Sequence, residues 1–179
     1  MTTAQVHDAV IIGSGFAGLG MAVIEHTWEF DETLQKELAD LQAQLKALRG
    51  NSNVLLYFYP KAMTPGCTVQ ACGLRDVQAE LAALDTVVLA VSPDPVKSLK
   101  KFAERDGLNF TLLSDPDHAV AEKYGVWGLK KFMGREFMGI LRTSFLIDKE
   151  GRLVHVMDKV QTKTHHDDVL ALLQSQMGS

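Results

Sequence analysis

Short apolar runs alternate with amphipathic stretches along most of the chain, which is the pattern of an α/β fold. Buried strands are predicted where β-branched and aromatic residues run together, as in VLLYFY, TVVLAVS and FTLLSD. Amphipathic stretches predict helices, the first from Cys67 to Leu84 and the later ones at VKSLKKFAERD, HAVAEKYG and from near Thr164 onward. SFLID and LVHVMD are separated by the turn Lys149-Glu150-Gly151, a hairpin signal. The sheet is therefore expected to be mixed.

The first fifty residues have a different texture. HDAVII reads as a short buried strand, and the GSGFAG that follows places Gly13, Gly15 and Gly18 where a tight turn opens a helix. A second helix is predicted from Asp31 as N-cap to Gly50 in the C′ position. Its apolar seam consists of Leu34, Leu38, Leu41, Leu45 and Leu48. Such a seam favours core packing, with a coiled-coil-like contact between two copies as the alternative.

Length and composition indicate one domain over residues 1–179, with 46% hydrophobic and 22% charged residues. The net charge of -4 argues against nucleic acid or an anionic membrane as partner. The apolar run from Ala9 to Ile24 follows Asp8 rather than a basic segment and is rich in glycine, so it predicts neither a signal peptide nor a membrane span. We expect a cytoplasmic protein whose partner is a small molecule or another protein.

The chemistry of the chain centres on Cys67 and Cys72, its only two cysteines. A close pair in an otherwise cysteine-free chain suits a reducing compartment and redox or metal chemistry. No histidine lies at zinc-ligand spacing from either cysteine, so no metal site is predicted. His165 and His166 are expected in the first turn of the last helix rather than at a metal.

Cys67 is predicted at the first turn of its helix, where unpaired N–H groups and the positive dipole end favour thiolate over thiol. Thr64, three residues earlier, can direct its hydroxyl toward the same pocket. Pro60 and Pro65 restrict the loop and are expected to keep Cys67 pointing outward. An accessible thiolate of this kind attacks peroxide and becomes a sulfenic acid.

Cys72 follows five residues later, which on an intact helix separates the two α-carbons by about 8–9 Å. A disulfide requires roughly 4.4–6.8 Å. If Cys72 reacts with Cys67, the first turns of the helix must therefore unwind. Two buried, inert cysteines are the alternative interpretation of the pair.

The pattern P-x-x-x-T-x-x-C at Pro60, Thr64 and Cys67 resembles the bacterioferritin-comigratory or Q-type peroxiredoxins. The neighbouring residues that match are Lys61, Pro65, Gly66, Thr68 and Cys72. LNFTLLSDPDHAVAEKYGVWG, RTSFLID and THHDDVL resemble the same family in the same order. The likeness covers about residues 53–178.

The resemblance implies a thioredoxin-like fold and reduction of hydroperoxides with electrons from a thioredoxin-type donor. It implies that Cys67 becomes sulfenic and that Cys72 condenses with it to a disulfide. Thr64 and Arg142 would organise the peroxide, with Arg142 also stabilising the thiolate, and Pro60 would shield the sulfenic acid from water. The chain is expected to be a monomer or a dimer.

The N-terminal segment departs from that family. VHDAVIIGSGFAGLGMAV resembles the Rossmann start of flavin-dependent monooxygenases, and the leucine-seam helix matches neither family. We therefore expect an engineered or recombined chain. In it a foreign βαα segment of residues 1–50, a Rossmann-type βα fragment plus an extra helix, replaces the first strand–helix unit of a fold completed by residues 51–179.

Dinucleotide binding at Gly13, Gly15 and Gly18 is disfavoured, because no second strand follows with an acidic residue for the ribose. No cofactor is therefore expected. Two other functions remain open: a catalytically weak scaffold with this fold, and a FAD- or NAD-binding module. Lys130, Lys131 and Arg135 are expected in a solvated loop that could help dock a donor protein.

Overall fold

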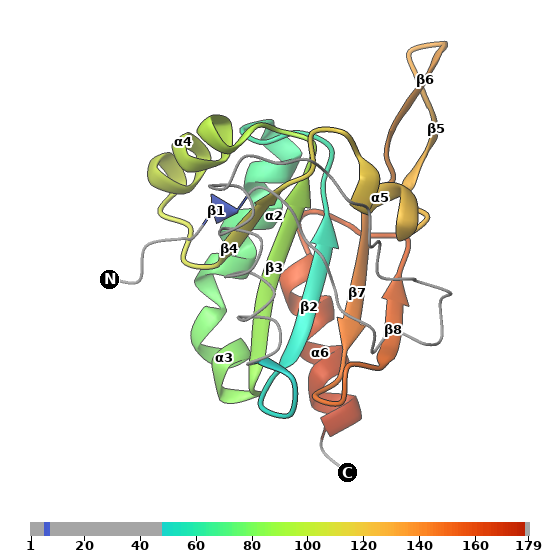
Figure 1. The fold of residues 1–179 in the computed structure, drawn as a ribbon. Helices are drawn as coiled ribbons and strands as arrows, with labels where there is room; N and C mark the ends of the chain where they lie inside the picture. The colour runs from blue at the N-terminus through green and yellow to red at the C-terminus, as the bar shows by residue number, and fades with distance from the viewer. Residues whose placement is uncertain (1–5, 8–47, 178–179) are drawn as a thin grey trace, which may run out of the picture.

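The computed structural model describes residues 6–7 and 48–177 of the chain. Their centre is a mixed six-stranded sheet (Figure 1). The strands in spatial order are β1 (Val6–His7), β4 (Thr111–Ser114), β3 (Thr86–Ser92), β2 (Asn53–Phe58), β7 (Thr143–Ile147) and β8 (Leu153–Met157). The first four run parallel, and β7 and β8 are antiparallel to their neighbours. The predicted mixed sheet is confirmed.

The helices are α2 (Pro65–Asp76), α3 (Gln78–Ala83), α4 (Val96–Asp106), α5 (Ala119–Lys123) and α6 (His165–Met177). The single helix expected from Cys67 to Leu84 is wrong, because it breaks at Val77, whose ψ of 15° is not helical. Just before the break, the carbonyl of Arg75 accepts a hydrogen bond from the side chain of Asn109. This contact with a segment 34 residues away is not visible in the local sequence.

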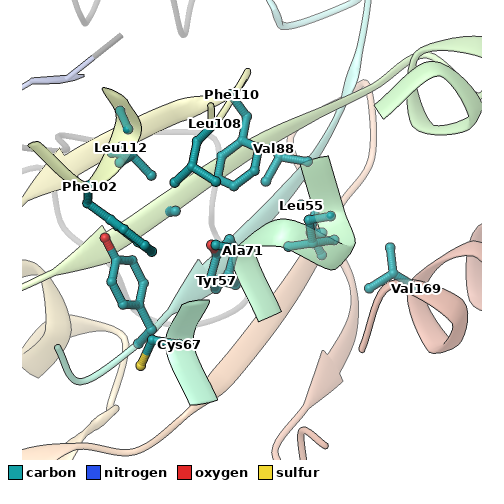
Figure 2. Close-up of a cluster of buried hydrophobic side chains, with 14 of the residues drawn as sticks. Leu55, Tyr57, Cys67, Ala71, Val88, Phe102, Leu108, Phe110, Leu112 and Val169 are labelled. Carbon is teal, nitrogen blue, oxygen red and sulfur yellow. The ribbon is translucent and has the colours of Figure 1, made fainter. Parts of the chain in front are cut away.

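Two apolar clusters cover the two faces of the sheet. Leu55 and Tyr57 of β2 point into the cluster under α2, α3, α4 and α6, part of which Figure 2 shows. Leu56 and Phe58 point into the second cluster, which α5 helps to cover. A strand buried on both faces has no polar side, and this explains why VLLYFY is apolar throughout.

A separate two-stranded hairpin, β5 (Trp127–Phe132) and β6 (Arg135–Ile140), extends from the body of the molecule (Figure 1). The solvated loop predicted for Lys130, Lys131 and Arg135 is therefore wrong: these residues lie in the strands. Met133 and Gly134 join the strands, both with positive φ, as in a type I′ turn. Methionine in place of the usual asparagine or aspartate hides the turn in the sequence.

Most predictions for the N-terminal segment concern residues outside those that the structure describes. They are the strand from residue 8 onward, the glycines Gly13, Gly15 and Gly18, and the leucine-seam helix up to residue 47. Within the described part, Leu48 packs against the second apolar cluster and Gly50 has φ +84°, as its predicted C′ position requires. No helix that the structure describes is long and apolar enough to cross a membrane.

Contact between α2 and α6 depends on Gly73, where an added Cβ would lie 2.5 Å from His166 Nδ1 and 3.1 Å from its Cγ. Because Cγ is the first ring atom, rotation of the ring alone cannot clear the clash. We predict that Gly73→Ala lowers the free energy of unfolding by about 1–3 kcal/mol, the usual cost of overpacking.

Gly66→Ala, in the same helix, is the matched control, because its Cβ would approach no atom closer than 3.7 Å. Urea denaturation of both variants measures the difference. Equal stabilities would show that α6 can move away from α2 at no cost.

Candidate active site

The loop between β2 and α2 is held by hydrogen bonds to the end of β3. The amide of Tyr59 donates to the carbonyl of Val91 at 3.0 Å, and the amide of Ala62 donates to Asp94 Oδ2 at 2.7 Å. Met63 takes a φ of +63°, which is unfavourable for a residue with a side chain. Backbone in this region persists where the surroundings fix it, and the two bonds supply that constraint.

Cys67 is the third residue of α2, which has Thr64 as N-cap and Pro65 at its start. Its side chain is only 2% exposed, so the expectation that Cys67 points outward into solvent is wrong. It lies at one end of the first apolar cluster, with its sulfur directed away from the other labelled side chains (Figure 2). Ala62 of the preceding loop belongs to the same cluster, so the loop covers the cysteine instead of presenting it.

Arg142 lies directly before β7 and reaches the cysteine from the far end of the sequence. Its Nη2 donates to Cys67 Sγ at 3.3 Å, across 75 residues. The structure thus brings Arg142 and Cys67 together. A permanent cation at this distance adds its positive potential to that of the helix N-terminus at the sulfur.

A buried polar chain extends behind Arg142. Its Nη1 donates to Gln70 Oε1, Gln70 Nε2 is 3.0 Å from His165 Nδ1, and His165 Nε2 is 2.8 Å from Ser144 Oγ. Gln70, His165 and Ser144 are all 0% exposed. The sequence interpretation missed Gln70 and Ser144. It placed His165 in the first turn of the last helix, where α6 has it, but gave it no part in the site. The one sequence signal was the i,i+3 spacing of Cys67 and Gln70, which places them on neighbouring positions of one helix face.

Two ionisable groups around this chain have shifted pKa values. Burial, opposed in part by Asp168, lowers the pKa of His165 to about 4, so the imidazole is neutral near pH 7. Burial, and after it the charge of Arg142, lowers the pKa of Lys130, while the nearby Cys67 opposes that shift. The Lys130 amine itself donates to the carbonyl of Ile140 at 2.9 Å, within its own hairpin.

The other predicted residues take less central positions. Thr64 Oγ1 donates to the carbonyl of Lys61 at 2.9 Å, and Pro60 is half-buried at the start of the loop. No group of three or more potential ligands that could hold a metal ion occurs among the described residues, and both ring nitrogens of His165 are already hydrogen-bonded.

Cys72 lies on α2, which runs unbroken past both cysteines, and both thiols are free. It is half-buried. Partial burial raises the pKa of its thiol, an effect that Arg75 opposes and Asp106 reinforces. Cys72 is therefore a protonated thiol in this conformation, on a helix too regular to let it reach Cys67.

Comparison with known proteins gives one consistent result. The AhpC/TSA family model matches residues 29–156. A putative peroxiredoxin bcp of Haemophilus influenzae is 58% identical over 131 residues, which cover 73% of this chain and 84% of the relative. Peroxiredoxin Bcp of Escherichia coli K12 is 54% identical over 140 residues, which cover 78% of this chain and 85% of the relative. Among solved structures, a bacterioferritin comigratory protein of Xanthomonas campestris superposes with a TM-score of 0.69 at 36% identity. The match covers 74% of this chain and 83% of that protein, which was solved in a study of its alkyl peroxide reduction activity.

The chain therefore belongs to the AhpC/TSA family, and within it to the peroxiredoxins of the Bcp and Q type. The predicted thioredoxin-like fold and thiol-dependent peroxidase function are confirmed. The predicted boundary needs correction. The family match begins at residue 29, so the whole leucine-seam segment, for which no match to this family was expected, falls within it.

The lowered pKa of His165 predicts an acid-sensitive fold. In the unfolded chain His165 takes up a proton below about pH 6.5, whereas in the folded protein it does so only near pH 4. Between these two pH values the unfolded state therefore binds more protons than the folded state. The free energy of unfolding must then fall as the pH drops through this window. From pH 7 to pH 5 we expect His165 to contribute a loss of about 2 kcal/mol.

His165→Asn is the control, because asparagine does not titrate while every other ionisable group is retained. Urea denaturation at the two pH values measures the loss in each protein. An equal loss in both would show that His165 titrates normally in the folded protein.

Proposed function

We propose that Cys67 is the peroxide-attacking residue, and the observation that carries this proposal is the Arg142 Nη2 contact to Cys67 Sγ at 3.3 Å. The sulfur lies in the first turn of α2, where the helix end adds positive potential to that of Arg142. Membership of the peroxiredoxin family supports the same assignment. The substrate is a hydroperoxide, hydrogen peroxide or an organic one.

In the first step the Cys67 thiolate attacks the terminal oxygen of ROOH. The S–O bond forms as the O–O bond breaks, sulfur is oxidised to a sulfenic acid, and the alkoxide or hydroxide takes up a proton and leaves as alcohol or water. Arg142 stabilises the charge as it passes from sulfur to the leaving oxygen. Because Cys67 is 2% exposed, the peroxide reaches it only through local movement of the surrounding side chains.

In the second step the Cys72 sulfur displaces the hydroxyl of the sulfenic acid. A disulfide forms and one water is released. Since both cysteines lie on the unbroken α2, this step requires the turns between them to unwind. A thioredoxin-type dithiol then reduces the disulfide and restores both thiols.

Thr64 and Pro60 have supporting roles in this proposal. The Thr64 hydroxyl, which here donates to Lys61, can rotate to meet the bound peroxide. Pro60 limits access of water to the sulfenic acid from the start of the loop. The hairpin cations Lys131 and Arg135 are exposed and available to a docking donor protein, whereas the Lys130 amine donates to the carbonyl of Ile140. The chain acts as a monomer or a dimer.

We further propose that residues 5–23 are a Rossmann-type segment of separate origin, joined to the peroxiredoxin. The start of the family match at residue 29, just beyond this segment, supports the proposal. A single natural gene encoding the same full-length chain in several related organisms would contradict it.

The roles of the two cysteines predict distinct products with one equivalent of hydrogen peroxide. The unaltered chain should lose both thiols within seconds as a disulfide. Cys72→Ser should hold a sulfenic acid on Cys67, and Cys67→Ser should keep its remaining thiol. Thiol titration and mass spectrometry distinguish these products. If the unaltered chain reacts no faster than a free cysteine, the fold serves here as a weak or inactive scaffold.

Resolution by Cys72 predicts that contacts holding the first turns of α2 slow disulfide formation. Arg105 Nη2 on α4 donates to Thr68 Oγ1 at 3.1 Å, an exposed bond that ties these turns in place. Thr68→Val removes the acceptor at almost constant shape and should speed disulfide formation about two- to fivefold, as loss of roughly 0.5–1 kcal/mol implies.

Thr68→Ser keeps the hydroxyl and should form the disulfide at the original rate. Stopped-flow fluorescence after a peroxide pulse separates this step from sulfenic acid formation. A Thr68→Val rate at or below the original would mean that α2 does not need to leave α4 for the thiols to meet.

A further inference from the structure

Arg142 is oriented by the neutral amide of Gln70 and not by a carboxylate. No carboxylate pairs with it in the part of the chain that the structure describes, and its side chain donates to Cys67 Sγ and Gln70 Oε1. A carboxylate at position 70 would neutralise much of the guanidinium charge. An amide oxygen orients the guanidinium and leaves its charge for the thiolate and the peroxide.

An amide is, however, ambiguous by itself. Its oxygen and its NH2 group are almost the same size, so Gln70 could turn over and present two N–H donors to Arg142. That orientation would repel the guanidinium. Something must therefore fix which end of the amide faces Arg142.

His165 supplies that constraint. Gln70 Nε2 carries only donors, so the His165 Nδ1 at 3.0 Å must be an unprotonated acceptor. A neutral imidazole then carries its hydrogen on Nε2, which donates to Ser144 Oγ at 2.8 Å. The hydrogen bonds run in one direction, from Arg142 to Gln70 and from Gln70 to His165.

We infer that His165 is a positioning residue of the peroxidase site, acting through Gln70 to keep the Arg142 guanidinium on the Cys67 sulfur. This inference rests on the proposed role of Cys67. Two observations support it beyond the bonds themselves. First, His165 is 0% exposed, and an apolar side chain would be less costly to bury at this position. Second, its ring packs edge-on against the ring of Tyr57, with 5.8 Å between the ring centroids, and this packing limits rotation of the imidazole.

Two substitutions of His165 separate positioning from simple packing. In His165→Asn, Oδ1 can take the place of Nδ1 and still accept from Gln70, while the donor to Ser144 is lost. In His165→Gln, the longer amide can still donate to Ser144, while the acceptor for Gln70 is lost. The first keeps the link to Arg142 and the second breaks it.

We expect the second-order rate constant of Cys67 oxidation by hydrogen peroxide to fall at least about tenfold in His165→Gln, since misplacing a catalytic group by about 1 Å can cost up to about a hundredfold. His165→Asn should stay within about threefold of the unaltered protein. In a Gln70→Leu background the His165→Gln effect should disappear, because the link through which it acts is gone. Urea denaturation of each variant shows whether the rates merely follow stability.

One measurement does not depend on any variant folding. The 15N spectrum of histidine-labelled protein near pH 7 should show His165 protonated at Nε2 and not at Nδ1. The opposite tautomer overturns the inference, as does an equal rate loss in His165→Asn and His165→Gln while the unaltered protein reacts fast. An unaltered protein that reacts no faster than free cysteine overturns the proposed function, and the inference with it.

Discussion

The contact between Arg142 and Cys67 is the constraint on which the rest of the site depends, and the sheet is what makes it possible. β2 and β7 pair antiparallel, with Phe58 opposite Thr143. The end of β2, which leads into the cysteine loop, therefore lies beside the start of β7, where Arg142 is attached. Two segments far apart in the sequence therefore meet at the same end of the sheet.

Burying this contact creates an electrostatic problem that the polar chain behind it solves. Charged and polar groups away from water are costly unless each is hydrogen-bonded. Gln70, His165 and Ser144 satisfy one another in sequence, so the chain ends on a neutral hydroxyl instead of an opposite charge. Arg142, which pairs with no carboxylate among the described residues, thus keeps its charge where charge moves in the proposed reaction, and this is the arrangement that electrostatic catalysis requires.

What could be predicted from the sequence was largely local. Most strands of the six-stranded sheet, most helices and the position of Cys67 at a helix start follow from short-range patterns, whereas the hairpin strands β5 and β6 were missed. Arg142 came only from the family resemblance, because its contact spans 75 residues. Gln70 and Ser144 were missed because a polar residue buried by tertiary contacts looks in sequence like one at the surface. The burial of Cys67 and the helix break at Val77 depend in the same way on packing from distant segments.

The proposed reaction makes opposite demands on α2, and the position of Gln70 reconciles them. The helix must be intact to hold Cys67 against Arg142, yet it must unwind for Cys72 to reach Cys67. Gln70 lies between the two cysteines, so unwinding must withdraw its amide from both Arg142 and His165. The arrangement that receives peroxide and the arrangement that forms the disulfide therefore exclude each other. Oxidation of Cys67 removes the thiolate that attracted Arg142, which weakens the helical arrangement at the point in the cycle where it has to open.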